Sequence, residues 1–329
     1  MSSNVSSDAC WLVGDVGSTN ARFGLVAAGD RSAALRDVAS LRCADYPGLA
    51  AAVEAYLARV PEPRPRVAAI AIAAPPTGDR LSLTNHPWTF SISETRQVLG
   101  LDRLDILNDF TALALSLPVL PMEDLVKVGE GSPTADAPLA VIGPGTGLGV
   151  SGLIKTGDRW MALTGEGGHA AFSPVTEREM DVARMLKRRY GHVSWERLLS
   201  GPGLVNLYES LAELTGQALE PLSPRDVSKR GMERSCPICS EALDMFCGTL
   251  GTAAGNLALT LGARGGVYIG GGIVPKLGAF FQRSAFRQRF EEKGRFADYL
   301  AAIPTYVISA RYPALIGSAI ALLAPAVSA

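Results

Sequence analysis

The chain has 329 residues, of which 47% are hydrophobic and 19% charged, a composition typical of a globular protein with room for two domains. This composition excludes an intrinsically disordered chain. The formal net charge of −1 gives no electrostatic footprint for nucleic acid or for an anionic membrane surface, so we expect neither partner and favour small-molecule chemistry.

The two ends of the chain and its cysteines favour the cytoplasm. Residues 1–9 are polar and rich in serine, without the basic and apolar regions of a signal peptide, and we interpret them as a short disordered leader. The apolar stretch 314–327 is too short to span a bilayer. Five cysteines argue against a disulfide framework, and although Cys236 and Cys239 have zinc-like spacing, a second ligand pair is missing.

In chain order, the first third predicts strands that alternate with helices, beginning with two strands joined by a tight turn. Short apolar runs bounded by glycine and proline indicate the strands. The expected elements are strands over 10–13 and 21–26, a helix over 49–59, a strand over 67–73, a helix over 93–99, a strand over 104–107 and a helix that begins near Phe110.

After a looser segment over 118–138, the second part predicts a new set of strands and more helix. We expect the final helix to return to the first domain, which gives a small domain of 1–117 plus 310–329 and a large domain of 118–309. The alternation predicts an α/β fold with a largely parallel sheet. The expected elements are strands over 139–142 and 150–154, helices over 177–189, 194–199 and 241–261, a strand over 267–269 and a helix from about Ala314.

The first tight turn has the residues of a phosphate-binding hairpin. Residues 14–22 read Gly-Asp-Val-Gly-Ser-Thr-Asn-Ala-Arg. A turn through Gly17 brings backbone N–H groups and the Thr19 hydroxyl against phosphate oxygens, while Asp15 can hold a magnesium ion through water. Ordinary hairpin-turn chemistry explains the same residues, so this motif alone leaves both interpretations open.

A second glycine-rich turn of the same kind lies between the strands 139–142 and 150–154. Residues 143–149 read Gly-Pro-Gly-Thr-Gly-Leu-Gly, without the Gly-Lys-Ser/Thr of a Walker loop and without the Gly-x-Gly-x-x-Gly of a dinucleotide fold. Two hairpins of this kind, one in each half, favour a nucleoside triphosphate held in a cleft.

Polar residues follow other strands as well. Asn108 and Asp109 lie at the carboxyl end of a strand, where open α/β sheets bind ligands. A carboxylate there can accept a proton from a substrate hydroxyl and align it for attack on a phosphoryl group. The alternative is that Asp109 caps the helix that begins at Phe110.

Three further segments are candidates for ligand contact. Glu166 and His169 share a glycine-rich turn, and together they can bind adjacent sugar hydroxyls, although a lone histidine is more often structural. Residues 270–272 are three glycines that can admit an adenine or ribose, or pack closely as a strand-to-helix turn before Pro275. Glu196 alone indicates a first-turn partner of a helix dipole.

Taken together, these segments resemble the bacterial glucokinase family of the hexokinase-like, actin-related superfamily. The resemblance runs in family order from Trp11 to about Ser318. It implies two domains with ribonuclease-H-like cores around a hinged cleft, a homodimer, and transfer of the ATP γ-phosphoryl group to the 6-hydroxyl of glucose, the first step of glycolysis. The residues that carry it are 14–22, 83–86, 108–112, 143–149, 165–169, 199–208 and 270–275.

The resemblance also implies roles for individual residues. Asp109 becomes the catalytic base, and the sugar ligands are Asn85, Asn108, Asp109, Glu166, His169 and Glu196, which replaces the dipole interpretation of Glu196. Asp15 would hold Mg²⁺ through water. The chain lacks the cysteine-rich zinc motif of the other bacterial sugar-kinase family, which leaves Cys236 and Cys239 as structural thiols. The residues implied for ATP are Gly14, Asp15, Val16, Gly17, Ser18, Thr19, Gly145, Thr146, Gly147, Gly271 and Gly272.

Two residues depart from the usual family pattern. Ser18 stands where the family usually has a second glycine, which costs ~1 kcal/mol if the position needs a positive φ and otherwise adds a hydroxyl near the phosphates. Pro144 stiffens the second loop and removes one donor. The alternatives to a glucokinase are a kinase for another hexose and a sugar-sensing regulator, and the presence of Asp109 argues against the regulator.

Overall fold

The computed structural model describes residues 9–60, 63–84 and 86–325, and these form two compact units. The first unit runs to Pro121 and resumes at Ala310, and the second is Met122–Ser309. The units divide after residues 121 and 309, and the divisions expected from the sequence follow residues 117 and 309. Asn85 and nearly all of the expected leader lie outside the described residues.

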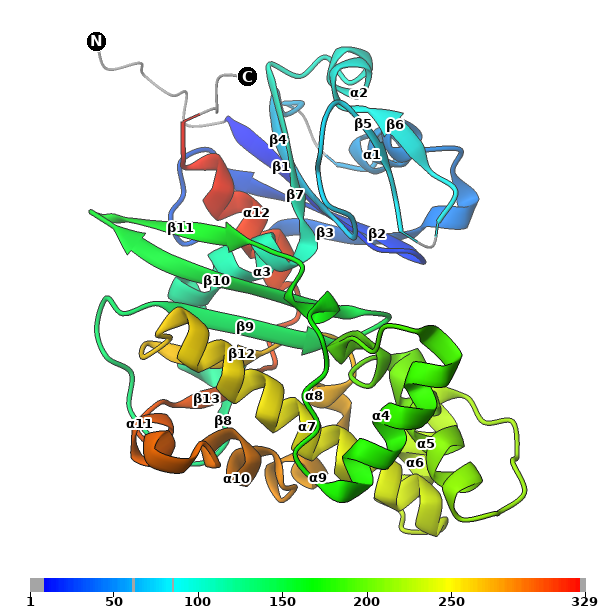
Figure 1. The fold of residues 1–329 in the computed structure, drawn as a ribbon. Coiled ribbons are helices and arrows are strands. Elements are labelled where there is room, and N and C mark those ends of the chain that lie inside the picture. Colours follow the sequence, from blue (N-terminus) through cyan, green and yellow to red (C-terminus); the bar gives the residue numbers. More distant parts are fainter. Residues whose placement is uncertain (1–8, 61–62, 85, 326–329) are drawn as a thin grey trace. The chain divides into compact units, whose positions relative to one another are not determined.

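The first unit is built on a five-stranded sheet in the order β3-β2-β1-β4-β7 (Figure 1). The pairs β1/β2 and β2/β3 are antiparallel, whereas β1/β4 and β4/β7 are parallel. A separate two-stranded ribbon joins β5 to β6. The strands are β1 (Cys10–Val16), β2 (Asn20–Ala27), β3 (Arg36–Arg42), β4 (Val67–Ile72), β5 (Arg80–Ser82), β6 (Thr89–Ser91) and β7 (Arg103–Asn108).

The last helix of the chain packs in this first unit, against α3 and the strands β1 and β4. A Cβ on Gly317 would lie 1.6 Å from the carbonyl oxygen of Ala112, so this close helix contact requires glycine. The Ser318 hydroxyl also donates to the carbonyl of Gly14 (3.3 Å). The helices of the unit are α1 (Leu49–Leu57), α2 (Ile92–Val98), α3 (Asp109–Ser116) and α12 (Pro313–Leu322), with the 3₁₀ turns η1 (Cys43–Asp45) and η2 (Leu117–Val119).

The second unit has a six-stranded sheet in the order β11-β10-β9-β12-β13-β8 (Figure 1). From β11 to β13 the pairs are antiparallel, antiparallel, parallel and parallel, the same succession as from β3 to β7. The sheets therefore confirm the predicted α/β class. The expectation of a largely parallel sheet is wrong, because antiparallel pairs make up half of the first sheet and, with β13/β8, most of the second. The strands are β8 (Leu125–Lys127), β9 (Leu139–Pro144), β10 (Leu148–Thr156), β11 (Arg159–Thr164), β12 (Gly266–Ile269) and β13 (Thr305–Ile308).

Helices of the second unit pack around α7, whose buried residues run along most of its length. This helix begins earlier than the expected residue 241, because Pro237 occupies its first turn and Cys236 caps it. The helices are α4 (Glu177–Tyr190), α5 (Gly201–Leu214), α6 (Pro224–Met232), α7 (Pro237–Leu261), α8 (Val274–Leu277), α9 (Ala279–Gln282), α10 (Phe286–Glu291) and α11 (Ala297–Ala301), with the 3₁₀ turns η3 (Met122–Asp124), η4 (Gly167–His169), η5 (Trp195–Arg197) and η6 (Gly294–Phe296).

The helix expected over 194–199 is wrong, because only the 3₁₀ turn η5 forms there. The Ser200 side chain accepts a hydrogen bond from Gly203 N–H and so caps α5 (2.9 Å). Its hydroxyl donates to the carbonyl of Glu196 (2.8 Å), which ends the preceding turn. Serine favours helix caps over helix interiors, and this preference separates the two elements.

One buried ion pair connects α4 to α10 inside the second unit. Glu179 is 2% exposed and pairs with Arg289 at 2.9 Å. Burial alone would raise the pKa of Glu179, but the Arg289 guanidinium and the backbone N–H groups of Val175 and Thr176 outweigh burial and hold this pKa below its usual value. Among the described helices, none is long and apolar enough to cross a membrane.

Candidate functional site

The turn of the first hairpin connects β1 to β2 and has a braced backbone. Gly17 N–H donates to the carbonyl of Asn20 (3.0 Å), and Cys43 N–H donates to the carbonyl of Thr19 (2.9 Å). Neither Gly17 nor Ser18 has a positive φ, so Ser18 does not carry the strain considered from the sequence. The Thr19 side chain is exposed. The turn therefore presents a hydroxyl on a fixed backbone.

Asp15 lies one residue before the end of β1 and forms an ion pair across the hairpin. Its Oδ2 accepts a hydrogen bond from Arg22 Nη1 at 3.0 Å, and the two residues are paired in the strand register. Burial raises the pKa of Asp15, and the positive charge of Arg22 opposes that effect. A cation at the carboxylate would act in the same direction as Arg22.

The carboxyl end of β7 supplies the second acid of this unit. Asn108 is the cap of α3, because its Oδ1 accepts hydrogen bonds from the N–H groups of Phe110 (2.9 Å) and Thr111 (3.2 Å). Asp109 is therefore the first residue of the helix and not its cap, although its Oδ1 also accepts from Phe110 N–H (2.9 Å). Asn108, and not Asp109, therefore has the helix-capping role that the sequence also allowed for Asp109.

Strand pairing places these residues at one edge of the sheet. In the parallel register Val16 pairs with Ile72 and Ile72 pairs with Asn108. The carboxyl ends of β1, β4 and β7 therefore coincide, and this is the edge at which open α/β sheets bind ligands. Asp15, the Thr19 turn and Asp109 share that edge. Gly14 is buried instead, and a Cβ there would lie 3.0 Å from Ile70 and 3.1 Å from Phe23, so its missing side chain serves packing.

The second hairpin connects β9 to β10 through Gly145, Thr146 and Gly147. Gly145 N–H donates to the carbonyl of Gly147 (2.8 Å), and Gly201 N–H donates to the carbonyl of Gly145 (2.8 Å). The Thr146 side chain is exposed. A Cβ on Gly145 would meet no atom closer than Gly272 N at 4.0 Å, and Gly145 has no positive φ. Packing therefore does not explain this glycine.

The three glycines after β12 lie against the start of this hairpin. A Cβ on Gly143 would approach the carbonyl carbon of Gly270 to 2.5 Å, and one on Gly271 would approach the carbonyl oxygen of Pro144 to 2.3 Å. Ile273 N–H donates to Pro144 carbonyl (3.3 Å). The two glycine-rich motifs of the second unit therefore form one surface of close-packed backbone.

Glu196 extends from η5 to the same hairpin, forty-eight residues away in sequence. Its Oε2 accepts a hydrogen bond from Leu148 N–H at 2.9 Å. A Cβ on Gly147 would lie 2.4 Å from this oxygen, so a larger residue there would displace the Glu196 carboxylate. Glu196 thus fixes the turn that follows Thr146.

Glu166 and His169 lie beside the start of β10, on the 3₁₀ turn η4 and its cap. A Cβ on Gly168 would lie 2.0 Å from the carbonyl oxygen of Leu148, so this glycine permits close packing of the turn. Both side chains are exposed, and neither forms a side-chain hydrogen bond or ion pair with the described residues. The second unit therefore gathers Glu166, His169 and Glu196 around one hairpin.

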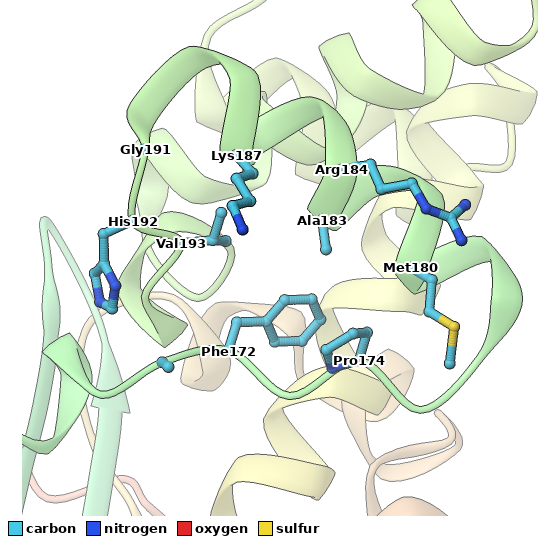
Figure 2. Close-up of a pocket in the computed structure, with 10 residues that line it drawn as sticks. Phe172, Pro174, Met180, Ala183, Arg184, Lys187, Gly191, His192 and Val193 are labelled. Carbon is cyan, nitrogen blue, oxygen red and sulfur yellow. The ribbon is translucent and has the colours of Figure 1, made fainter.

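A separate cavity of about 410 Å³ is lined by α4 and by the segments before and after it. Phe172 and Pro174 precede α4, and Ala183 of α4 points toward Phe172 across the cavity (Figure 2). His192 also lines it, and His192 Nε2 lies 3.1 Å from the carbonyl oxygen of His169. None of the sequence-predicted site residues lines this cavity.

Comparisons with known proteins decide the family. The sequence model described as Glucokinase matches residues 12–325. A glucokinase of Chromobacterium violaceum is 55% identical over 308 residues, which cover 94% of this chain and 88% of that protein. The chain belongs to the glucokinase family. The crystal structure of a glucokinase from an Antarctic psychrotroph agrees, with a TM-score of 0.87, 35% identity and coverage of 95% of this chain and 98% of that one.

Membership of the glucokinase family extends over both units, since the matched residues begin in β1 and end beyond α12. A more distant structure, a ROK family glucokinase of Streptomyces griseus in complex with glucose and AMPPNP, is 17% identical with a TM-score of 0.62 and covers 94% of this chain and 98% of that chain. At that identity it supports the sugar-kinase fold alone.

Sequence reasoning missed two contacts of the site. The Asp15–Arg22 pair could have been found, because opposite charges directly across an antiparallel hairpin attract each other and the motif contains both residues. The contact of Glu196 with Leu148 N–H had no local signal, since it depends on how η5 packs on β10.

Proposed function

We propose that this protein is a glucokinase that transfers the γ-phosphoryl group of ATP to the 6-hydroxyl of glucose. The observation that carries the proposal is the position of Asp109, at the carboxyl end of β7 and the start of α3, in a chain that matches the glucokinase family over residues 12–325. The product would be glucose 6-phosphate, the compound that enters glycolysis.

The nucleotide would be held mainly by backbone. The exposed hydroxyls of Thr19 and Thr146 stand on turns whose backbone is braced by hydrogen bonds, and such turns supply N–H groups to phosphate oxygens. Gly272 has no atom within 4 Å of a Cβ position and no positive φ, so an adenosine can approach its bare backbone. The proposal for ATP rests on these surfaces and on the family.

The chemistry of Asp15 fits a magnesium ion held through water. Magnesium prefers oxygen ligands and retains several waters, and Asp15 offers a carboxylate whose Oδ2 is oriented by Arg22. When bound with ATP, the ion would neutralise phosphate charge. Arg22 then has two effects, because it positions the carboxylate and competes with the cation for it.

For the sugar, we propose Asn108, Asp109, Glu166, His169 and Glu196 as ligands. Oδ1 of Asn108 is used by the helix cap, so its amide Nδ2 is the atom left to donate to a sugar oxygen. Glu196 keeps one oxygen, Oε1, beyond the Leu148 N–H contact. Asn85 is part of the same proposal from the family resemblance.

The proposed reaction depends on positioning and on one proton transfer. Asp109 aligns the sugar hydroxyl and accepts its proton, while the oxygen attacks the γ-phosphorus and ADP leaves. A carboxylate is a weak base relative to the alkoxide of a sugar hydroxyl, so the proton moves late in the transfer. Negative charge on Asp109 is favoured in the first turn of α3 by the helix dipole.

The family resemblance also leads us to propose a homodimer in the cytoplasm. Light scattering of the purified protein tests the dimer, since a monomer mass at micromolar concentration would contradict it.

A coupled assay of ADP release across a panel of hexoses tests the function. We expect glucose to give the highest kcat/KM, with fructose, mannose and N-acetylglucosamine lower, because a site that binds each hydroxyl leaves groups unpaired when one is displaced. A higher value for another hexose would reassign the substrate. Glucose binding without ADP release would instead favour a sugar-sensing regulator.

A further inference from the structure

A pair of cysteines that the proposed reaction does not use lies where α6 meets α7. Cys236 caps the 25-residue helix α7, and Cys239 N–H donates to Cys236 Sγ at 3.4 Å. Cys236 is half-buried and Cys239 is buried, and neither forms a disulfide. Two thiols separated by two residues, with the first at a helix start, are arranged as in dithiol redox motifs.

The surroundings argue against a metal at this pair. Among the described residues, no group of three or more histidine, cysteine, aspartate or glutamate side chains could hold a metal ion. A structural zinc site needs four such ligands. The chemistry open to the pair is therefore that of the sulfur atoms themselves.

The pKa values of the two thiols are shifted in opposite directions. Burial alone would raise the pKa of Cys236, but hydrogen bonds from the Cys239 N–H and thiol, with the positive charge of Arg230, outweigh burial and lower this pKa below the usual value. Burial raises the pKa of Cys239 to about 12. The thiol of half-buried Cys236 is therefore assigned as the nucleophile, and that of buried Cys239 remains protonated.

We propose that Cys236 and Cys239 form a redox-active dithiol that small-molecule disulfides oxidise to an intrachain disulfide. The Cys236 thiolate attacks one sulfur of the disulfide, which forms a mixed disulfide and releases one thiolate. Cys239 then loses its proton to solvent and attacks the Cys236 sulfur, which closes the intrachain bond and releases the second thiolate. The pair loses two electrons, and the small disulfide gains them.

Glutathione disulfide, applied to the full chain, is the probe for this proposal. In wild-type protein, peptide mapping should find Cys236 linked to Cys239 and no bound glutathione. In the Cys239→Ser variant one glutathione should remain on Cys236, because the resolving thiol is gone. In the Cys236→Ser variant the rate of adduct formation should fall about tenfold or more.

The serine variants allow a loss of thiol reactivity to be distinguished from a loss of folding. Serine is a good helix cap, so Cys236→Ser preserves the start of α7, and circular dichroism checks that the variants match the wild type. Adducts that form first on Cys10, Cys43 or Cys247 would overturn the proposal. So would a Cys236→Ser variant that reacts as fast as wild type, or a wild-type protein that keeps glutathione on Cys236. None of these readouts depends on kinase activity.

Discussion

The two hairpins occupy the same place in two sheets that share the succession of five strands, yet the space beside them is filled differently. Val16 and Pro144 are the last residues of β1 and β9, so Asp15 and Gly143 occupy corresponding positions. Beside Asp15 the parallel strand β4 carries Ala71, which leaves room for a carboxylate. Beside Gly143 lies the backbone of Gly270, which leaves none.

This difference distinguishes glycines that the fold requires from glycines that it does not require. Gly143 is required by its neighbour in the fold, because a Cβ would collide with the backbone of Gly270, whereas a Cβ on Gly147 would displace only the end of the Glu196 side chain. Gly17 and Gly145 have room for a Cβ and no positive φ, so the fold does not require them. We attribute these two to the approach of a phosphate. At the corresponding strand position, the first hairpin thus carries the carboxylate of Asp15 and the second carries close-packed backbone.

The largest effect is expected at the acid of the first unit. Asp109→Asn keeps the shape of the side chain but cannot accept the proton, so kcat should fall by ~10³-fold while the glucose dissociation constant stays within about threefold. Coupled assays and calorimetric titration measure the two quantities. Asp102→Asn, at an exposed ion pair with Arg66, is the matched control and should keep the parent kcat. A parent rate in the Asp109 variant would remove its role as base.

The second largest effect is a loss of stability, expected at Gly143 before the turn of the second hairpin. Gly143→Ala should lower the free energy of unfolding by about 3 kcal/mol, because the new methyl group lies 2.5 Å from the Gly270 carbonyl carbon and the backbone must shift. Urea denaturation measures this. Gly145→Ala, whose nearest neighbour is 4.0 Å away, should stay within about 1 kcal/mol of the parent. Equal stability of the two variants would refute the distinction between them.

A smaller effect is expected at Glu166, an exposed acid that we propose as a sugar ligand in the second unit. Glu166→Gln should reduce kcat/KM for glucose about 30-fold, or about 2 kcal/mol, because a charged acceptor for a sugar hydroxyl is lost. KM for ATP should not change. Asp158→Asn, an exposed acid in the β10–β11 turn, serves as control. If kcat/KM is unchanged, Glu166 does not contact the sugar.

The smallest effect tests the glycine that packing does not explain. Gly17→Ala should raise KM for ATP about tenfold while the free energy of unfolding changes by less than about 1 kcal/mol, because the methyl group would occupy the space that we propose for phosphate and meets Asn20 O only at 3.7 Å. Gly48→Ala, also in open space, should leave KM unchanged. A large loss of stability in Gly17→Ala would mean that the fold needs this glycine.

The sequence predicted those parts of the site that depend on neighbours along the chain. Both hairpins and the strand ending at Asn108 follow from apolar runs next to glycine or polar residues, so they were placed within a few residues. The helix expected over 194–199 failed because the side chain of Ser200 stops one element and starts the next. Competition between a cap and a helix interior is difficult to judge from periodicity.

Contacts between distant segments could not be predicted. The hydrogen bond between Glu196 and Leu148 joins residues 48 apart, and it exists because η5 packs against the start of β10. The close approach of Gly270 and Gly271 to Gly143 and Pro144 likewise depends on the parallel pairing of β12 with β9. Packing of this kind brings motifs that are distant in sequence close together, and their spacing along the chain does not predict it.

Phosphorus NMR of the product formed from ATP and glucose tests the central claim most directly. We expect ADP and glucose 6-phosphate in equal amounts, and we expect 6-deoxyglucose, which lacks the acceptor hydroxyl, to yield no sugar phosphate and to inhibit the reaction. A phosphate on another hydroxyl of glucose, or ATP hydrolysis to inorganic phosphate alone, would contradict the claim.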